Sequence, residues 1–325
     1  MGAQPSCSLA GTNSSGGSGV RDVAIVCGPT AAGKSAIAMA LAARTGALLI
    51  SADSRQIYRS FDIGTAKPSP ADRAAVPHCG IDIVEPSERF SAALWAESAT
   101  TWLRAAALRE QPVIIVGGTG FYLRALEAPL FESPPLDPVR RSAVLLALEA
   151  LSTESLRARC RTIDPARAEL GRTQLLRAVE TFELTGRPLS AWLAERARPS
   201  DVRAHYLLVD PGGVLPERIA SRVQQMIDAG WEREVEQLTR SVPADAPAWN
   251  ACGYAMLRSA QAGELSRGAA IERTVIATRQ YAKRQRTWFR HQLPVERVTR
   301  LDPTAPDALA HAQTWLDAVS LTEHM

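Results

Sequence analysis

The sequence predicts an α/β protein with a doubly wound parallel sheet of the P-loop NTPase-like kind and a helical insertion domain. Short apolar segments alternate with helix-like stretches, as in sheets that carry helices on both faces. One apolar run breaks into the pattern GxxxxGKS. Residues 124–199 are arginine-rich and helical in pattern, without a convincing strand. We therefore expect a disordered polar tail at 1–20, a P-loop core formed by 21–123 and 200–325, and an inserted helical domain at 124–199.

Five apolar segments are typical of buried parallel strands. They span residues 23–27, 47–50, 113–116, 206–209 and, more weakly, 295–301. Helices are expected at 91–109 after the cap Ser91, at 216–229 before Gly230, and at 266–292 after the cap Ser266. Within the insertion, helices should begin near Asp137, Ser152, Asp164 and Pro188.

The composition is typical of a soluble cytoplasmic protein. No apolar run approaches the roughly 20 residues of a membrane-spanning helix, so no membrane association is expected. The N-terminal residues lack the basic start and apolar core of a signal peptide. Odd in number and widely scattered, the cysteines favour reduced thiols and argue against a zinc site. They are Cys7, Cys27, Cys79, Cys160 and Cys252.

The run VAIVCGPTAAGKS predicts a site for linked phosphates. Backbone N–H groups of the glycine turn and the positive end of the following helix cradle phosphate oxygens. Lys34 supplies a point charge, and the Ser35 hydroxyl is a ligand for Mg²⁺. The motif alone does not distinguish ATP from another pyrophosphate. The residues expected to bind diphosphate are Gly28, Pro29, Thr30, Ala31, Ala32, Gly33, Lys34 and Ser35.

Two further strand ends carry candidate site residues. Asp53 follows the strand at 47–50 and should lie on the same rim as the phosphate loop, where it contacts a ligand or simply caps the next turn. The strand at 113–116 ends in GGTG, with Thr119 where a nucleotide hydrolase usually has an acidic metal ligand. The missing acid counts against a protein that hydrolyses ATP.

The helix at 266–292 carries a stripe of cations. Arg279, Lys283, Arg286 and Arg290 are spaced by four, three and four residues, so they share one face, with Tyr281 and Trp288 among them. Cations with neighbouring aromatic rings suit a nucleic-acid backbone and an unstacked base, although a solvated helix face over core aromatics has the same pattern. Of 37 basic residues only Lys34, Lys67 and Lys283 are lysines, which marks these positions for attention.

Taken together, these residues resemble the tRNA dimethylallyltransferases, also called tRNA isopentenyltransferases. The matching blocks are GPTAAGKS, ADSRQIYRSFDIGTAKP, GGTGFYLRAL, LLRAVETFELTGRPLS, RIASRVQQMIDAGWEREV, CGY and YAKRQRTWFR, and all three lysines fall inside them. The resemblance implies transfer of the dimethylallyl group from dimethylallyl diphosphate to the exocyclic amine of the adenosine just 3′ of a tRNA anticodon.

The resemblance also assigns roles. Asp53 is the candidate base for the amine proton, and Lys34, Arg222 and Mg²⁺ near Ser35 stabilise the diphosphate. Thr119 and Arg124 line the route of an adenosine extruded from the anticodon loop. The residues expected to contact tRNA are Asp53, Ser54, Arg55, Gln56, Thr119, Arg124, Gln174, Arg177, Cys252, Gly253, Tyr254, Lys283, Arg284, Gln285, Arg286, Trp288 and Arg290.

Three positions depart from the family pattern. Ala32 stands where serine is common, residues 171–174 replace an Asp-x-Gln-Arg-like contact, and Asn250 stands where a basic residue is frequent. Two alternatives stay open, an isopentenyltransferase acting on free AMP or ADP and a P-loop small-metabolite kinase. We expect a monomer without an obligate protein partner.

Overall fold

The computed structural model describes residues 20–128, 138–195 and 200–322. The chain divides into two compact units, one formed by Met1–Glu127 with Ser200–Met325 and the other by Ala128–Pro199. The second unit begins at Ala128 and not at the expected residue 124, because helix α4 (Gly120–Glu127) packs along α3 (Ala92–Ala107) in the first unit. The predicted tail at 1–20 lies almost wholly outside the described residues. Among the helices described, none is long and apolar enough to cross a membrane.

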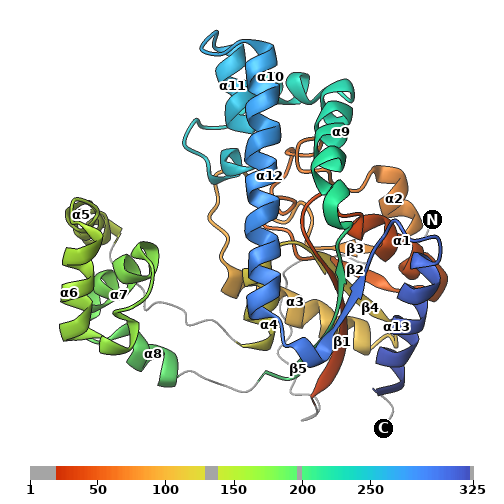
Figure 1. Cartoon of the computed structure of the whole chain (residues 1–325), viewed down its shortest axis with the longest axis horizontal. Helices are drawn as coiled ribbons and strands as arrows, with labels where there is room; N and C mark the ends of the chain where they lie inside the picture. Colours follow the sequence, from red (N-terminus) through yellow and green to blue (C-terminus); the bar gives the residue numbers. More distant parts are fainter. Residues whose placement is uncertain (1–19, 129–137, 196–199, 323–325) are drawn as a thin grey trace. The chain divides into compact units, whose positions relative to one another are not determined.

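The first unit is built on a six-stranded parallel sheet with strand order β3-β2-β4-β1-β5-β6 (Figure 1). All five predicted strands are present, and the weak segment at 295–301 contributes its second half. The two-residue strand β3 was not predicted, because it is too short to carry a pattern. The strands are β1 (Arg21–Cys27), β2 (Leu48–Ser51), β3 (His78–Cys79), β4 (Val113–Gly117), β5 (Val202–Val209) and β6 (Val298–Leu301).

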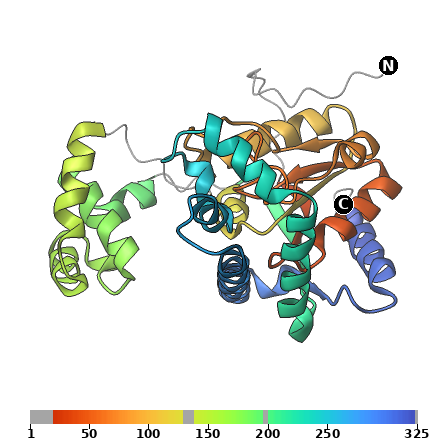
Figure 2. The ribbon, with the colours of Figure 1, turned by 90° about the horizontal axis from the view of Figure 1, so that it is seen from above.

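Alternating residues of these strands fill two hydrophobic cores, one on each face. Val26 and Leu49 pack with α1 (Lys34–Thr45) and α13 (Ala308–Thr322), whereas Ile25 and Ile50 pack on the α3 side. The sheet therefore lies between α3 and the pair formed by α1 and α13 (Figure 2). Coverage of both faces is the doubly wound arrangement that the apolar strands predict.

Four helices of the same unit pack against one another in a separate group. They are α9 (Leu215–Asp228), α10 (Trp231–Ser241), α11 (Tyr254–Gln261) and α12 (Arg267–Gln292), and α2 (Pro70–Ala75) completes the unit. The helices at 91–109, 216–229 and 266–292 are confirmed, with Ser91 and Ser266 as their caps where predicted. The long α12 contacts both α9 and α11, so one helix spans this group (Figure 1).

The second unit is helical, as expected, with its own small apolar core. Its helices are α5 (Pro138–Glu149), α6 (Thr153–Ile163), α7 (Arg172–Thr185) and α8 (Leu189–Glu195). The helix start near Asp164 is wrong. Asp164 ends α6, Pro165–Arg167 forms one 3-10 turn, and the next helix begins at Arg172. The buried Asp164 carboxylate instead accepts the backbone N–H of Ser190 at 3.0 Å, so it joins two segments of this unit.

The chain leaves the first unit and returns to it at one anchored place. The Ser200 hydroxyl donates to the Leu126 carbonyl at 2.7 Å. The neighbouring Glu127 carboxylate accepts the Tyr206 hydroxyl at 2.5 Å and pairs with Arg297. The last residue before the insertion and the first after it are therefore tied to the same edge of the sheet.

Three cysteines agree with the expected reduced thiols. Cys27, Cys160 and Cys252 are free. Cys7 lies outside the described residues.

Candidate active site

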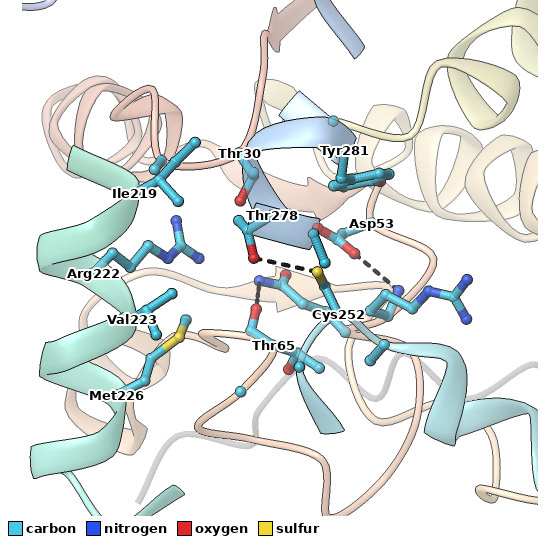
Figure 3. Close-up of a pocket in the computed structure, with 18 of the residues that line it drawn as sticks. Thr30, Asp53, Thr65, Ile219, Arg222, Val223, Met226, Cys252, Thr278 and Tyr281 are labelled. Carbon is cyan, nitrogen blue, oxygen red and sulfur yellow. Dashed lines mark hydrogen bonds between the residues drawn. The ribbon is translucent and has the colours of Figure 1, made fainter. Parts of the chain in front are cut away.

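A cavity of about 540 Å³ opens in the first unit, where several strand ends meet α9 and α12 (Figure 3). The start of α1, after the loop that follows β1, contributes Lys34, the loop after β2 contributes Asp53, and the loop after β4 contributes Gly118. Arg222 lines it from α9 and Tyr281 from α12. Three of the five residues thus follow strand ends, because carboxyl ends of parallel strands meet at one edge of a sheet.

The phosphate loop, residues 28–35, adopts the conformation that its motif predicts. Gly28 has φ +144°, and a Cβ there would lie 2.1 Å from the Val209 carbonyl oxygen, so only glycine fits. The Lys34 ammonium donates to the Pro29 carbonyl at 2.7 Å, across the loop. Burial and the nearby Arg222 lower the pKa of Lys34 to about 8, while Asp53 opposes that shift. Cations held in this way gain most from an anionic ligand.

Helix α9 brings two arginines to the phosphate loop. Burial lowers the pKa of Arg222, and Asp53 partly offsets the effect. One turn earlier, the Arg218 guanidinium donates from Nε to the Ala31 carbonyl at 3.0 Å. Arg218 was not predicted as a site residue, although its i,i+4 spacing from Arg222 in RIASRV places both on one face. Arg218 therefore supports the loop, and Arg222 lines the cavity.

Asp53 serves the turn and the cavity at once. Its Oδ1 atom accepts the backbone N–H of Arg55 at 2.9 Å, while the carboxylate lines the cavity (Figure 3). The Thr119 hydroxyl accepts the backbone N–H of Ser54 at 3.0 Å, so the loops after β2 and β4 are tied together. Burial, followed by the charge of Asp53, raises the pKa of Tyr281 to about 12. The structure confirms that Asp53 caps its turn, and contact with a ligand stays a prediction.

Two glutamines expected to contact tRNA instead organise the protein. The Gln285 amide is buried, accepts the Thr30 backbone N–H at 2.8 Å and donates to the Gly118 carbonyl at 2.8 Å. The Gln56 amide accepts the Ser51 hydroxyl at 2.9 Å and donates to the carbonyls of Thr65 and Ala66. Because these groups are already hydrogen-bonded inside the chain, we do not propose either as an RNA contact.

The segment of residues 53–67, here called the second loop, is fixed from outside itself. The buried Glu234 carboxylate of α10 accepts the backbone N–H groups of Asp62 at 3.0 Å and Ile63 at 2.7 Å. It also accepts the Tyr254 hydroxyl at 2.5 Å, and Tyr254 is 0% exposed. Tyr254, another expected tRNA contact, is thus a core residue. Glu234 was not predicted, although it lies in a matching block.

Lys67 holds the same loop and does not line the cavity. Its ammonium donates to the Tyr58 carbonyl at 2.5 Å and pairs with Asp62 at 2.7 Å and Asp82 at 2.5 Å. The side chain is 2% exposed. The rare lysine at this position is therefore structural, because three oxygen partners neutralise a buried charge.

Three other expected tRNA contacts line the cavity directly. Arg55 follows Asp53, and Gly253 and Cys252 come from the turn before α11. The Cys252 sulfur lies 3.2 Å from the Thr278 hydroxyl of α12 (Figure 3). These three residues can contact a molecule that enters the cavity.

In the cation stripe of α12, Arg286 is in an ion pair, and Arg279, Lys283 and Arg290 are exposed. Arg286 forms a two-pronged ion pair with Asp210, and Arg279 donates to the Pro216 carbonyl at 3.3 Å. Lys283 and Arg290 are exposed. The predicted contacts away from the stripe also reach the surface: Arg284 is exposed, Trp288 is half-buried, and Arg124 is exposed with a 3.3 Å hydrogen bond to Gln292.

Gln174 and Arg177 belong to the second unit, where both are exposed on α7. The Gln174 carbonyl accepts the Gly171 backbone N–H at 3.2 Å and caps the start of that helix. The sequence GRTQ at 171–174 therefore has a local structural use, although it departs from the family pattern.

The fold and this cavity define a P-loop-like α/β protein with a cavity that Lys34, Arg222 and Asp53 line. The chain belongs to the IPP transferase family, whose sequence model matches residues 56–292. It is 40% identical to the tRNA dimethylallyltransferase of a Picosynechococcus species, over 89% of this chain and 96% of that protein. The same identity is found with the tRNA dimethylallyltransferase of Mesorhizobium japonicum, over 85% and 88%.

Solved structures agree with this assignment. The full-length tRNA isopentenylpyrophosphate transferase of Bacillus halodurans has a TM-score of 0.66 and 30% identity, over 94% of this chain and 100% of that one. The Staphylococcus epidermidis protein of the same kind has a TM-score of 0.65 and 28% identity, over 92% and 99%. A eukaryotic dimethylallyltransferase that acts on tRNA shares the fold, with a TM-score of 0.77 and 23% identity over 94% and 80%.

Proposed function

We propose that this enzyme transfers the dimethylallyl group from dimethylallyl diphosphate to the exocyclic amine of the adenosine 3′-adjacent to a tRNA anticodon. The observation that carries the proposal is one cavity lined by Lys34, Arg222 and Asp53, with Arg222 and Asp53 on different sides of it (Figure 3). Membership of the IPP transferase family and the names of the curated relatives support the donor and the acceptor.

The arrangement accounts for both halves of the reaction. The bond between the allylic carbon and the diphosphate oxygen breaks, the bond from that carbon to the adenine amine nitrogen forms, and diphosphate leaves. Lys34, Arg222 and the loop amides stabilise the negative charge that develops on the leaving group. Asp53 accepts the amine proton, which an aromatic amine must lose as the new bond forms.

Mg²⁺ remains part of the proposal as a diphosphate-bound ion. Among the described residues, no cluster of three His, Cys, Asp or Glu could hold a metal by itself. The Ser35 hydroxyl lines the cavity beside Lys34, and Mg²⁺ typically binds through substrate phosphates, waters and one or two protein oxygens. These residues fit an ion of that kind. When bound, it would offset negative charge on the diphosphate.

The acceptor distinguishes this proposal from its alternatives. A transferase acting on AMP or ADP has no use for exposed cations along α12, and a kinase needs ATP as its donor. The test incubates purified protein with labelled dimethylallyl diphosphate and either unmodified tRNA or AMP. A separate reaction supplies ATP with nucleosides. We expect label on tRNA alone, with ATP at most a competitor. A strict requirement for ATP turnover would overturn the proposal.

The contribution of the second unit to tRNA binding, through Gln174 and Arg177, stays a prediction from the sequence. A cytoplasmic location and a monomeric state also stay predictions.

A further inference from the structure

Ala31, at the tip of the phosphate loop, holds a backbone conformation that alanine rarely adopts. Its φ of +62° lies in the left-handed region. There the Cβ atom of an L-residue crowds the following carbonyl oxygen. A residue in such a conformation keeps it only when the surrounding structure holds it in place. The loop therefore depends at this point on contacts with other elements.

Two kinds of contact hold Ala31. The Arg218 guanidinium of α9 donates from Nε to the Ala31 carbonyl at 3.0 Å. The Ala31 side chain packs in a small buried cluster with Leu215 and Ile219 of α9 and with Ala282 of α12. Apolar packing is non-directional, so it fixes the position of the methyl group and not the direction of the carbonyl. The hydrogen bond from Arg218 fixes that direction.

Arg218 approaches the loop from a hollow of about 480 Å³ that adjoins the active-site cavity. Ala31 and Arg222 line both spaces, whereas Arg218 belongs to the lining of the hollow and not to the described lining of the cavity. A Cβ at Gly33 would lie 3.2 Å from Nη2 of Arg218, so the guanidinium extends across the loop from Ala31 to Gly33. Its contacts are thus with the loop and not with the space that a diphosphate would occupy.

The directions of the amides on either side of Ala31 change if this residue leaves the left-handed region, because φ and ψ set those directions. Inward-pointing amides are what a phosphate loop offers an anion. We propose that Arg218 is a positioning residue that keeps the phosphate loop in its anion-binding conformation before the donor binds. Without its hydrogen bond, Ala31 returns to a negative φ in part of the molecules. The apparent dissociation constant for diphosphate then rises as the competent fraction falls.

This inference rests on the proposed function for the identity of the anion, and a double-mutant cycle tests it. Calorimetry measures the affinity of inorganic diphosphate for the native chain, Arg218→Gln, Ala31→Gly and the double variant. Arg218→Gln should weaken binding by about tenfold, the scale of the strain at one left-handed alanine. Glycine adopts a positive φ without strain, so the same substitution should cost about twofold or less when Ala31→Gly is also present. Rescue by a glycine, which adds no charge, separates positioning from direct attraction of the anion.

Steady-state kinetics give a second readout. Arg218 is exposed, so Arg218→Gln removes no core packing. Its KM for dimethylallyl diphosphate should rise while kcat changes little, because the bound diphosphate itself restores the loop. Arg233→Gln, at an exposed arginine of α10, is the charge-matched control and should leave both constants unchanged.

Two outcomes distinguish this inference from the proposed function. Equal losses of diphosphate affinity from Arg218→Gln with and without Ala31→Gly would overturn the positioning role while leaving the proposed transfer intact. A native chain that binds diphosphate, with the expected rescue, but prenylates no RNA would overturn the proposed function and leave the positioning role standing.

Discussion

The phosphate loop and the second loop both follow a strand of the same sheet and reach the same cavity, yet they are held in different ways. The phosphate loop is closed by its own lysine, which donates to the Pro29 carbonyl. The second loop is held by Glu234, which is 172 positions from Asp62 along the chain, and by the ion pair of Lys67 with Asp82. The first loop is closed by its own lysine and is also held by Gln285 and Arg218, whereas the second loop depends mainly on the rest of the fold.

This difference determines what each loop offers a ligand. In the phosphate loop, Lys34 is a half-buried cation with a lowered pKa, so an anion relieves an unfavourable arrangement. In the second loop, the backbone N–H groups of Asp62 and Ile63 are already satisfied by Glu234. Binding is therefore concentrated in the first loop, and the second loop presents a rigidly placed carboxylate at Asp53.

The largest effect on kcat should come from Asp53, the first residue of the second loop. Asp53→Ala should lower kcat by roughly a hundredfold or more, the range that a general base contributes, with little change in tRNA affinity. Single-turnover rates and filter-binding affinities measure the two quantities separately. A variant that retains nearly full kcat would show that Asp53 only caps its turn.

The next effect addresses how the second loop is held. Glu234→Ala should lower the free energy of unfolding by about 3 kcal/mol, because it leaves buried backbone N–H groups and the Tyr254 hydroxyl without an acceptor. Urea denaturation measures the change. Glu236→Ala on the same helix is the matched control, since its ion pair with Arg240 is exposed and should be worth at most about 1 kcal/mol. Equal losses of stability in the two variants would contradict the conclusion that Glu234 holds the second loop.

Ionisation of Lys34 in the phosphate loop should make diphosphate affinity depend on pH. In the free protein Lys34 loses its proton as the pH rises through about 8, whereas bound diphosphate favours the charged form and raises this pKa. Diphosphate affinity should therefore fall above pH 8, by up to about tenfold per unit, and this contribution should level off below it. Lys34→Met should remove that slope while the ionisation of the ligand itself persists. Identical pH profiles would refute the assignment.

The smallest effect concerns the cations of α12. Lys283→Gln and Arg290→Gln should each reduce the salt dependence of tRNA affinity by about one unit or less in the log–log slope. Arg286→Gln should change the slope little, because Asp210 already pairs with that guanidinium. Affinity for an anticodon stem-loop across a salt series gives the slopes. If a variant carrying both Lys283→Gln and Arg290→Gln has an unchanged slope, these cations do not contact RNA, and the second unit would have to supply the phosphate contacts.

Local patterns predicted the parts of the protein that local interactions determine. The phosphate loop, the strand at 23–27 and the caps Ser91 and Ser266 are where the sequence places them. Strand β3 escaped prediction because two residues carry no periodicity. Asp164 was misread as a helix start because an acidic residue before proline is also suited to a 3-10 turn.

Residue roles at the site were less predictable than the site itself. The resemblance to the family marks Gln285 and Tyr254 but cannot say whether a polar group faces RNA or the core. Gln285 turns inward to Thr30 and Gly118, and Tyr254 turns inward to Glu234. Whether such a side chain points to the core or to the surface depends on contacts between segments that are distant in the sequence. The same limit explains why Arg218 and Glu234 were not singled out.

The hydrogen bond from Ser200 to Leu126 has a consequence for protein engineering. Because the two ends of the insertion meet at one place, residues 128–199 form a cassette that can be excised and replaced by a short glycine-containing turn without cutting the sheet. The trimmed chain would keep the whole active-site cavity, whose lining comes entirely from the first unit. The predicted contribution of the insertion to tRNA binding could then be measured separately from the chemistry of the first unit.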